Sequence, residues 1–165
     1  MHYTIAIFSE IEKNNQIQEI RKKYDPSYNF IKPHIGLVYY FDKKPSNEQI
    51  HIILKSITPF NIKLEKIRAP SKSNFIFLDV TEGKEKVHKM KNVMYHQLKL
   101  KWDKPFSYKP HITLANLKSK KEQRAALKEI KNTKFNIKLK IDSFSLLDVS
   151  EDLKTIKSRK KFEFS

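Results

Sequence analysis

One short phrase occurs twice in this chain, once in each half. Residues 32–37 read KPHIGL and residues 109–114 read KPHITL, so that His34 and His111 are 77 residues apart. In each copy a proline comes directly before the histidine and an apolar run follows it. Such a repeat constrains the fold, because the chain must build the same local structure twice.

Two further landmarks recur at nearly the same spacing and in the same order. A Ser-x-x-Gln/Glu capping box begins at Ser46 and again at Ser119, 73 residues later. The pattern TxFNIKL occupies residues 58–64 and returns at residues 133–139, an offset of 75. Together the three landmarks predict two structurally similar halves, roughly residues 1–70 and 71–165.

Short apolar segments alternate with amphipathic ones throughout both halves. The expected strands are 3–8, 35–41, 60–67, 75–80, 112–117 and one or two strands within 135–149, and the expected helices are about 12–24, the segment after Ser46, about 84–100 and the segment after Ser119. The basic run 157–161 is expected to be a loop before a final strand at 161–164. Several neighbouring strands alternate in polarity, so we expect an α+β fold with antiparallel sheets.

Length and composition limit the class of protein. A chain of 165 residues fits a single domain with its own core. Because the chain has no cysteine, disulfides, iron–sulfur clusters and thiolate zinc sites are excluded. No run approaches the roughly 18 apolar residues that a membrane helix needs. We therefore expect a soluble cytoplasmic protein, a monomer without a membrane partner.

The net charge of +16 suits a partner that carries phosphate. The positive charge comes mainly from scattered lysines, and the chain has only four arginines, Arg21, Arg68, Arg124 and Arg159. Arginine is the residue of bidentate base and phosphate recognition. We therefore expect a general positive field with non-specific RNA contact, and not sequence-specific nucleic-acid binding.

The two histidines of the repeated phrase are the leading candidates for chemistry. Along an extended segment residues i and i+2 share a face, so His34 lies beside Gly36 and His111 beside Thr113. If the two halves pack symmetrically, both imidazoles face one cleft. Because histidine titrates near neutrality, one ring can then accept a proton while the other donates one. At a phosphodiester, Thr113 could hold a non-bridging oxygen.

Other sites of chemistry have weaker support in the sequence. The remaining histidines, among them His88 and His96 on an expected helix, form no HExxH motif or compact cluster with acids. The chain also contains no phosphate-cradling glycine loop and no GxSxG elbow. We expect neither a metal nor a cofactor.

The two phrases with their flanks resemble the paired His-x-Thr/Ser-hydrophobic motifs of the 2H phosphoesterases, a superfamily that includes 2′–5′ RNA ligase-like proteins and cyclic phosphodiesterases. Residues 33–41 (PHIGLVYYF) look like the first motif, and residues 106–115 (FSYKPHITLA) look like the second. Residues 21–28 (RKKYDPSY) are similar to a small bacterial branch of phosphoesterases. The resemblance implies a bilobal α+β fold with pseudo-two-fold symmetry, a central cleft between antiparallel sheets, and helices on the outside.

The resemblance also implies an activity, the metal-free cleavage of cyclic or 2′–5′ phosphodiesters of RNA or nucleotide type. By that analogy His34 is the proton donor, His111 is the proton acceptor and Thr113 contacts a phosphate oxygen. The further candidates for substrate contact are Gly36, Lys32, Lys109, Tyr40 and Tyr108.

Two positions depart from the family pattern. Gly36 stands where the first motif has a hydroxyl, and Asn116 stands where many bacterial members have arginine. Either the enzyme is slow, or another group replaces the hydroxyl, or the glycine admits a bulkier substrate. The expected activity is that of a hydrolase on phosphoric ester bonds. The alternatives are a weak or inactive RNA- or phosphate-binding module and a 2′–5′ RNA ligase.

Overall fold

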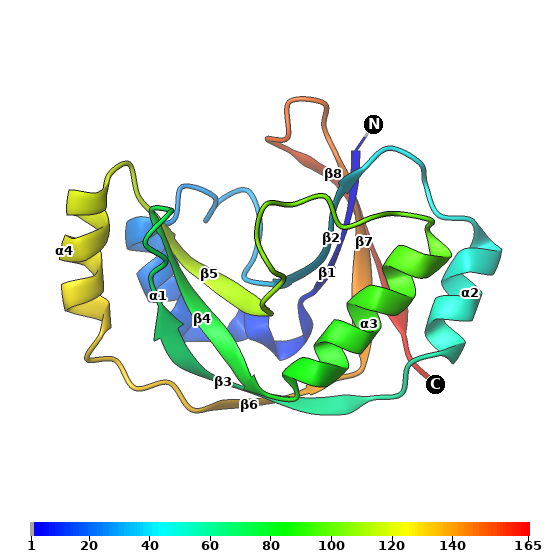
Figure 1. Ribbon diagram of the computed structural model, residues 1–165, viewed down its shortest axis with the longest axis horizontal. Helices are drawn as coiled ribbons and strands as arrows, with labels where there is room; N and C mark the ends of the chain where they lie inside the picture. Colours follow the sequence, from blue (N-terminus) through cyan, green and yellow to red (C-terminus); the bar gives the residue numbers. More distant parts are fainter. Residues whose placement is uncertain (1) are drawn as a thin grey trace.

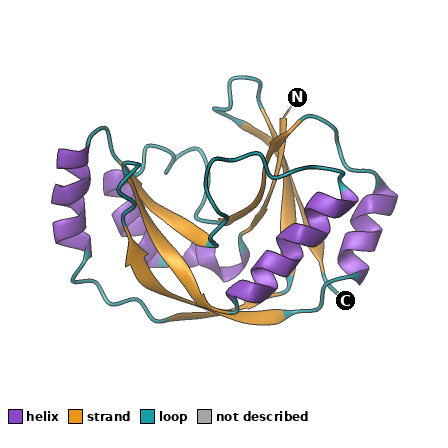
Figure 2. Cartoon of the chain, viewed as in Figure 1, coloured by secondary structure: helices purple, strands orange, loops and turns teal. Residues whose placement is uncertain are grey.

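The computed structural model describes residues 2–165, which form an α+β fold around one curled antiparallel sheet (Figures 1 and 2). The elements are β1 (His2–Ile7), a 3₁₀ helix η1 (Ser9–Lys13), α1 (Asn15–Tyr24), β2 (Ile35–Phe41), α2 (Asn47–Lys55), β3 (Phe60–Arg68), β4 (Phe75–Glu82), α3 (Lys84–Gln97), β5 (His111–Asn116), α4 (Lys120–Ile130), β6 (Ile137–Ile141), β7 (Ser143–Val149) and β8 (Ile156–Glu163). The predicted class is confirmed, and within residues 2–165 no helix is long and apolar enough to cross a membrane.

The sheet is arranged symmetrically about its two central strands. Its strand order is β6-β3-β4-β5-β2-β1-β7-β8, so that β5 and β2, which carry the two KPHI phrases, are neighbours in the middle. The helices follow the same order in both halves, because α1 and α3 come after β1 and β4 while α2 and α4 come after β2 and β5. In Figure 1, α1 and α4 lie at one end of the molecule and α2 and α3 at the other.

The two halves of the sequence are interleaved in space. Strand β3, from the first half, pairs with β4 from the second, and β7, from the second, pairs with β1. Helix α1 packs on β5, and α3 packs on β2. The expected boundary near residue 70 therefore divides the repeated pattern in the sequence and does not divide the sheet, because each half of the sequence supplies strands to both sides.

The landmarks do not all mark equivalent positions. Ser46 and Ser119 both cap their helices, each accepting a hydrogen bond of 3.1 Å from the backbone three residues on. The TxFNIKL segments instead form β3 and β6, which are neighbouring strands with Phe60 opposite Ile141. By position in the sheet β3 corresponds to β7, so this third landmark is a local likeness and not a structural equivalence.

The basic run at residues 157–161 was wrongly expected to be a loop. It lies inside β8, which pairs with β7 from Ser143 opposite Glu163 to Val149 opposite Ile156. This strand is at the edge of the sheet, and its lysines are exposed. Lysines on an edge strand are a common means of preventing further strand pairing, so the charge that suggested a loop is a property of the edge.

Candidate active site

The strands β2 and β5 meet at a single registered pair, Ile35 opposite Ile112. Continuing this antiparallel register by one residue in each direction sets His34 opposite Thr113 and Gly36 opposite His111. All four then share one face of the sheet, with the two histidines as diagonal neighbours, for which Cα separations of about 7–8 Å are typical. Two positions predicted to act together are thus neighbours in the fold.

The face on the other side of this crossing is the core. Ile35, Leu37, Ile112 and Leu114 are all fully buried, as their alternation with the histidines predicts. Because these four side chains are fixed by packing, the backbone that carries the histidines is fixed too. The repeated phrase therefore places both imidazoles on rigid strands at the centre of the sheet.

Each histidine is held in one tautomer by its own phrase. The ring Nδ1 of His34 lies 2.8 Å from the carbonyl oxygen of Lys32, and that of His111 lies 2.7 Å from the carbonyl oxygen of Lys109. A carbonyl only accepts, so Nδ1 carries the hydrogen in both rings and Nε2 has the free lone pair. The residue before a proline prefers an extended backbone, which is how the Lys-Pro-His order presents this carbonyl twice.

Burial favours the neutral form of both rings. It lowers the pKa of His34 to about 4, with the positive charges of Arg21 and His111 as smaller causes in the same direction. It lowers the pKa of His111 as well, and there Arg68 adds to the effect while Asp79 opposes it.

A cavity of about 220 Å³ lies over the crossing of β2 and β5. Four of the predicted site residues line it, namely His34, Gly36, Tyr40 and Thr113. His111 is not among its lining residues, and its ring packs instead on Phe77, with 4.0 Å between ring centroids. The cavity thus opens onto the His34 ring and the Thr113 hydroxyl from one side.

A β-bulge in each central strand brings one further residue to the cavity. The sequence did not reveal these two residues as a pair. Along β2, Leu37 has no partner between the pairs Ile5–Val38 and Ala6–Gly36, and along β5 Leu114 is skipped in the same way. An extra residue shifts the alternation of side chains by one. As a result Tyr39 and Asn116, each five positions after its histidine, face the cavity again.

The structure gives a physical reason for the glycine in the first phrase. A Cβ atom built on Gly36 would lie 2.9 Å from Cε1 of Tyr39, closer than such atoms approach in real proteins. The Tyr39 ring therefore occupies the space beside Gly36 that a threonine side chain would need. Asn116 follows His111 by five residues, as Tyr39 follows His34. Because asparagine is smaller than tyrosine, Thr113 has room for its hydroxyl.

Each histidine ring also packs at a tilt against a phenylalanine ring that an ion-paired arginine covers. On the second side Arg68 lies over Phe77, with its Cζ 4.8 Å from the ring centroid, and its Nε donates to Asp79 at 2.7 Å. On the first side the His34 ring lies 5.5 Å from that of Phe8.

Phe8 is covered in turn by Arg159, whose Cζ lies 3.7 Å from the ring centroid. The guanidinium of Arg159 donates two hydrogen bonds to the carboxylate of Glu12. A cation over one face of a ring is favourable, so both stacks are fixed from behind. The four residues that build them were not recognised in the sequence.

A third arginine, Arg21, is buried behind His34. Its guanidinium donates to Asp25 at 2.8 Å, to the carbonyl of Ile31 at 2.8 Å and to Gln18 at 3.1 Å. These bonds tie α1 to the loop that leads into the first phrase. Three of the four arginines thus lie around the two histidines. Because the positive charge of this sequence comes mainly from lysine, the few positions that have arginine were a signal for this site.

The remaining predicted contacts are placed less directly. Lys32 is exposed and lines no cavity, so its part in the site is the carbonyl that holds His34. Tyr108 is buried, and its hydroxyl donates to the carbonyl oxygen of Gly36 at 2.7 Å. It thereby joins the segment before His111 to β2. Within residues 2–165 no group of three or more histidine, aspartate or glutamate side chains is arranged to hold a metal.

Comparison with known sequences identifies relatives over most of the chain. The sequence profile of the 2′–5′ RNA ligase superfamily matches residues 9–153. A protein of Oceanobacillus iheyensis named "Putative phosphoesterase OB1230" is 28% identical over 155 residues, which cover 89% of each chain. A Bacillus cytotoxicus protein of the same description is 28% identical over 156 residues, covering 89% of this chain and 88% of the relative.

Solved structures share the fold at low sequence identity. E. coli LigT complexed with 3′-AMP superposes with a TM-score of 0.66 at 17% identity, covering 99% of this chain and 98% of LigT. The Thermus thermophilus protein TT0787 gives a TM-score of 0.57 at 17% identity over the full length of both chains. These likenesses support the arrangement of helices and strands described above.

Proposed function

The chain belongs to the 2′–5′ RNA ligase superfamily, the group of 2H phosphoesterase-like proteins, and from its site we propose that it hydrolyses a cyclic or 2′–5′ phosphodiester of RNA or nucleotide type by two-histidine acid–base catalysis. The observation that carries the proposal is the pair of imidazoles on adjacent strands. Both have their Nδ1 hydrogen engaged by a backbone carbonyl and their Nε2 free.

The proposed reaction uses the two Nε2 atoms on opposite sides of one phosphorus. His111 accepts a proton from water as the water oxygen bonds to phosphorus. The bond from phosphorus to the leaving ribose oxygen breaks, and that oxygen takes the proton from Nε2 of His34. Thr113 donates its hydroxyl hydrogen to a non-bridging oxygen as negative charge builds there. Proton exchange with solvent then returns both rings to their starting states.

The donor must be charged before it can act, although burial lowers the pKa of both rings and so favours their neutral forms. A phosphodiester anion between the rings stabilises an imidazolium and so raises its pKa. Substrate binding is therefore expected to take up about one proton near pH 7. Calorimetry in buffers of different ionisation enthalpy measures this proton uptake.

The principal test is substitution of each histidine. On a nucleoside 2′,3′-cyclic phosphate, His34→Ala and His111→Ala are each expected to lower kcat/KM by about 10³ or more, since general acid–base groups typically contribute 10²–10⁴. His51→Ala, on the exposed face of α2, is the matched control and should retain full activity. Full activity in either site variant would rule out the paired mechanism.

The alternatives have distinguishable outcomes in the same assays. A 2′–5′ ligase runs the same chemistry in reverse, and would join RNA ends at a higher rate than it cleaves the linkage. A binding module would hold RNA without turnover, and its affinity would survive loss of both histidines.

A further inference from the structure

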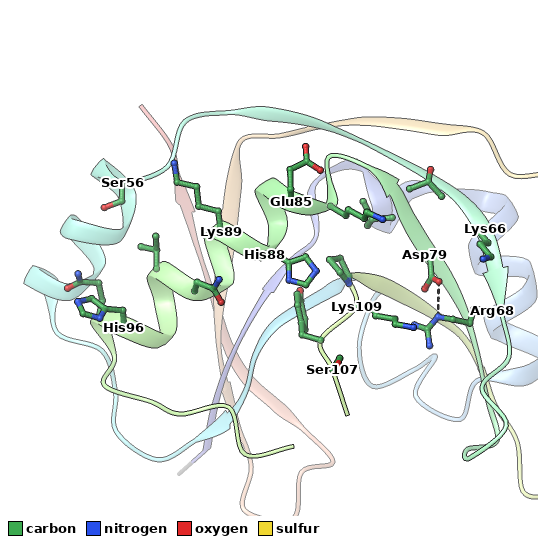
Figure 3. Close-up of a pocket in the computed structure, with 18 residues that line it drawn as sticks. Ser56, Lys66, Arg68, Asp79, Glu85, His88, Lys89, His96, Ser107 and Lys109 are labelled. Atoms are coloured by element: carbon green, nitrogen blue, oxygen red, sulfur yellow. Dashed lines mark hydrogen bonds and ion pairs between the residues drawn. The ribbon is translucent and has the colours of Figure 1, made fainter. Parts of the chain in front are cut away.

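A groove of about 1060 Å³ lies beside the segment that leads into His111 and shares no lining residue with the 220 Å³ cavity (Figure 3). One wall is α3, and the other is formed by β3 and β4. Its labelled charged and imidazole side chains are Lys66, Arg68, Asp79, Glu85, His88, Lys89, His96 and Lys109. The reaction proposed above assigns no role to the residues of this groove.

The charge of the lining favours an anion. The groove is lined by two acidic residues, Asp79 and Glu85, and by five basic ones. The basic residues are Lys66, Arg68, Lys84, Lys89 and Lys109. The acid Asp79 is already paired with Arg68. Lys66, Lys84, Lys89 and Lys109 have no acidic partner within 4 Å among residues 2–165. Four uncompensated lysines in one concave surface form a positive field that attracts phosphates.

The groove borders the segment that leads into His111, although His111 is not itself among the lining residues. Arg68, which lines the groove, covers the phenylalanine on which the His111 ring stacks. Asp79 lies opposite His111 in the strand pairing, and Lys109 precedes it by two residues. A ligand with its phosphate at His111 can therefore continue into the groove without leaving the surface.

The two volumes together indicate the size of that ligand. Pockets for small molecules usually measure about 300–1,000 Å³. The catalytic cavity is smaller than this range, and the groove is larger than a mononucleotide requires. Along α3 the groove runs from Lys84 to His96, which is about 18 Å at the 1.5 Å rise of a helix.

The remaining lining suits a single-stranded nucleic acid. His88, Asn92 and His96 follow one another at intervals of four along the wall of α3. Imidazole rings can stack on bases, and an amide can bond to base edges or to ribose hydroxyls. Lysines supply point charges and not a bidentate base code. This combination of a basic track with flat side chains is typical of sequence-tolerant strand binding.

We propose that the groove between α3 and strands β3 and β4 binds the sugar–phosphate backbone of a single-stranded RNA, so that the protein acts on the phosphodiester at the end of a strand in preference to a free mononucleotide. The proposal rests on the proposed function for the reaction at the histidines. The strand itself is held by Lys66, Lys84, Lys89 and Lys109, with His88 and His96 against its bases.

The test compares two substrates in one pair of variants. Lys84→Gln/Lys89→Gln removes two charges from the groove. Lys121→Gln/Lys128→Gln removes two exposed, unpaired lysines from α4 at the other end of the molecule. The substrates are a pentaribonucleotide ending in a 2′,3′-cyclic phosphate and the matching mononucleoside 2′,3′-cyclic phosphate.

The groove variant should lower kcat/KM for the pentaribonucleotide about tenfold at low salt and leave the mononucleotide value within twofold. The slope of log kcat/KM against log salt is negative, and its magnitude should decrease by about 1.4. Each of the two lost contacts to a single strand contributes roughly 0.7 to that slope. The α4 variant should change neither. Equal losses on both substrates, or equal losses in both variants, would overturn the proposal.

A binding measurement separates this proposal from the proposed function. Fluorescence anisotropy of a labelled pentaribonucleotide 3′-phosphate reports affinity without turnover. Weaker binding by the groove variant alone supports the groove even if the wild type hydrolyses nothing. Unchanged binding refutes it even if the histidines prove catalytic. A polyglutamate peptide of equal charge that binds as tightly as the RNA would also refute it.

Discussion

His34, directly before β2, and His111, at the start of β5, occupy equivalent positions in the repeated phrase, yet their surroundings differ. Behind His34 lie the fully buried pair Arg21 and Asp25, and the position two residues on is a glycine covered by a tyrosine ring. Behind His111 lie Arg68 and Asp79, which are partly exposed and line a wide basic groove. The second phrase also keeps its hydroxyl, at Thr113.

This difference teaches how a duplicated scaffold can divide one task. The repeated backbone sets the tautomer and direction of both rings, because Lys-Pro-His presents the same carbonyl each time. The side chains around the repeat then decide exposure and charge. The half around His34 lines a small cavity and is supported from within the core, and the half around His111 borders a wide groove. Four predictions test this division.

The largest effect is expected from the roles of the two histidines. An aryl phosphodiester with a 4-nitrophenyl leaving group needs no proton at its leaving oxygen. If His34 is the donor, His34→Ala should lose about 10³ in kcat/KM on a cyclic phosphate but recover to within about tenfold of wild type on the aryl ester. His111→Ala should stay low on both substrates. Steady-state rates of both variants on the two substrates test this assignment. Recovery of His111→Ala, and not of His34→Ala, on the aryl ester would mean that His111 is the proton donor.

The next effect concerns the hydroxyl that only one phrase has. Thr113→Val keeps the shape of the side chain and removes the donor to the developing oxyanion, for which a loss of about 10²–10³ in kcat is expected. Gly36→Ala removes no donor and only presses on the ring of Tyr39, so a loss of a few-fold is expected. Matching thermal melts would show that both variants fold. Similar losses at the two positions would mean that the halves contribute equally to phosphate binding.

The third prediction concerns the two arginine–aspartate pairs. Arg21 is 2% exposed and Asp25 is comparably buried, so Arg21→Met leaves a buried carboxylate and should reduce the free energy of unfolding by about 3–5 kcal/mol. Arg68→Met should cost about 1 kcal/mol, since that pair is partly hydrated. Urea unfolding measures both. The double variant Arg21→Met/Asp25→Leu should regain part of the loss, and no recovery would point to a role beyond charge pairing.

The smallest effect is the pH dependence of stability. A histidine whose pKa is lowered by folding stabilises the fold above its unfolded pKa near 6.5, and this stabilisation is lost as pH falls toward the folded pKa, about 4 for His34. One such proton changes the unfolding free energy by at most about 1.4 kcal/mol per pH unit. Urea midpoints between pH 7 and pH 4.5 should therefore fall less steeply in His34→Asn than in wild type. An unchanged slope would show that His34 is hydrated.

The sequence predicted the two central strands because the signals that determine them are local. Four of the seven residues of β2 are buried, namely Ile35, Leu37, Val38 and Phe41, and the proline fixes where each phrase begins. The bulges were not predictable from the pattern. Leu37 and Val38 are both apolar, as are Leu114 and Ala115, so that one residue of each pair can be accommodated as an insertion without a change in composition. Strict alternation without a bulge would place Tyr39 and Asn116 on the core face, with Ile35 and Ile112.

Misleading signals arose where a pattern had two physical causes. The TxFNIKL segments are alike because both are half-buried strands of similar polarity, and the structure makes them neighbours and not equivalents. The lysines of β8 looked like a loop because an edge strand with an exposed face has no need of alternation. In both cases the local sequence satisfies more than one arrangement.

By itself, the sequence determined the repeated phrase, the placement of two histidines at the start of core strands and the positive charge of the protein. These follow from residues within a few positions of one another, where backbone preference and alternation act. What surrounds each histidine depends on the packing of distant segments. The arginine–phenylalanine stacks, the contact of Tyr39 with Gly36 and the groove beside α3 bring together residues from distant parts of the chain. Such contacts depend on how the strands cross and curl, which no local pattern specifies.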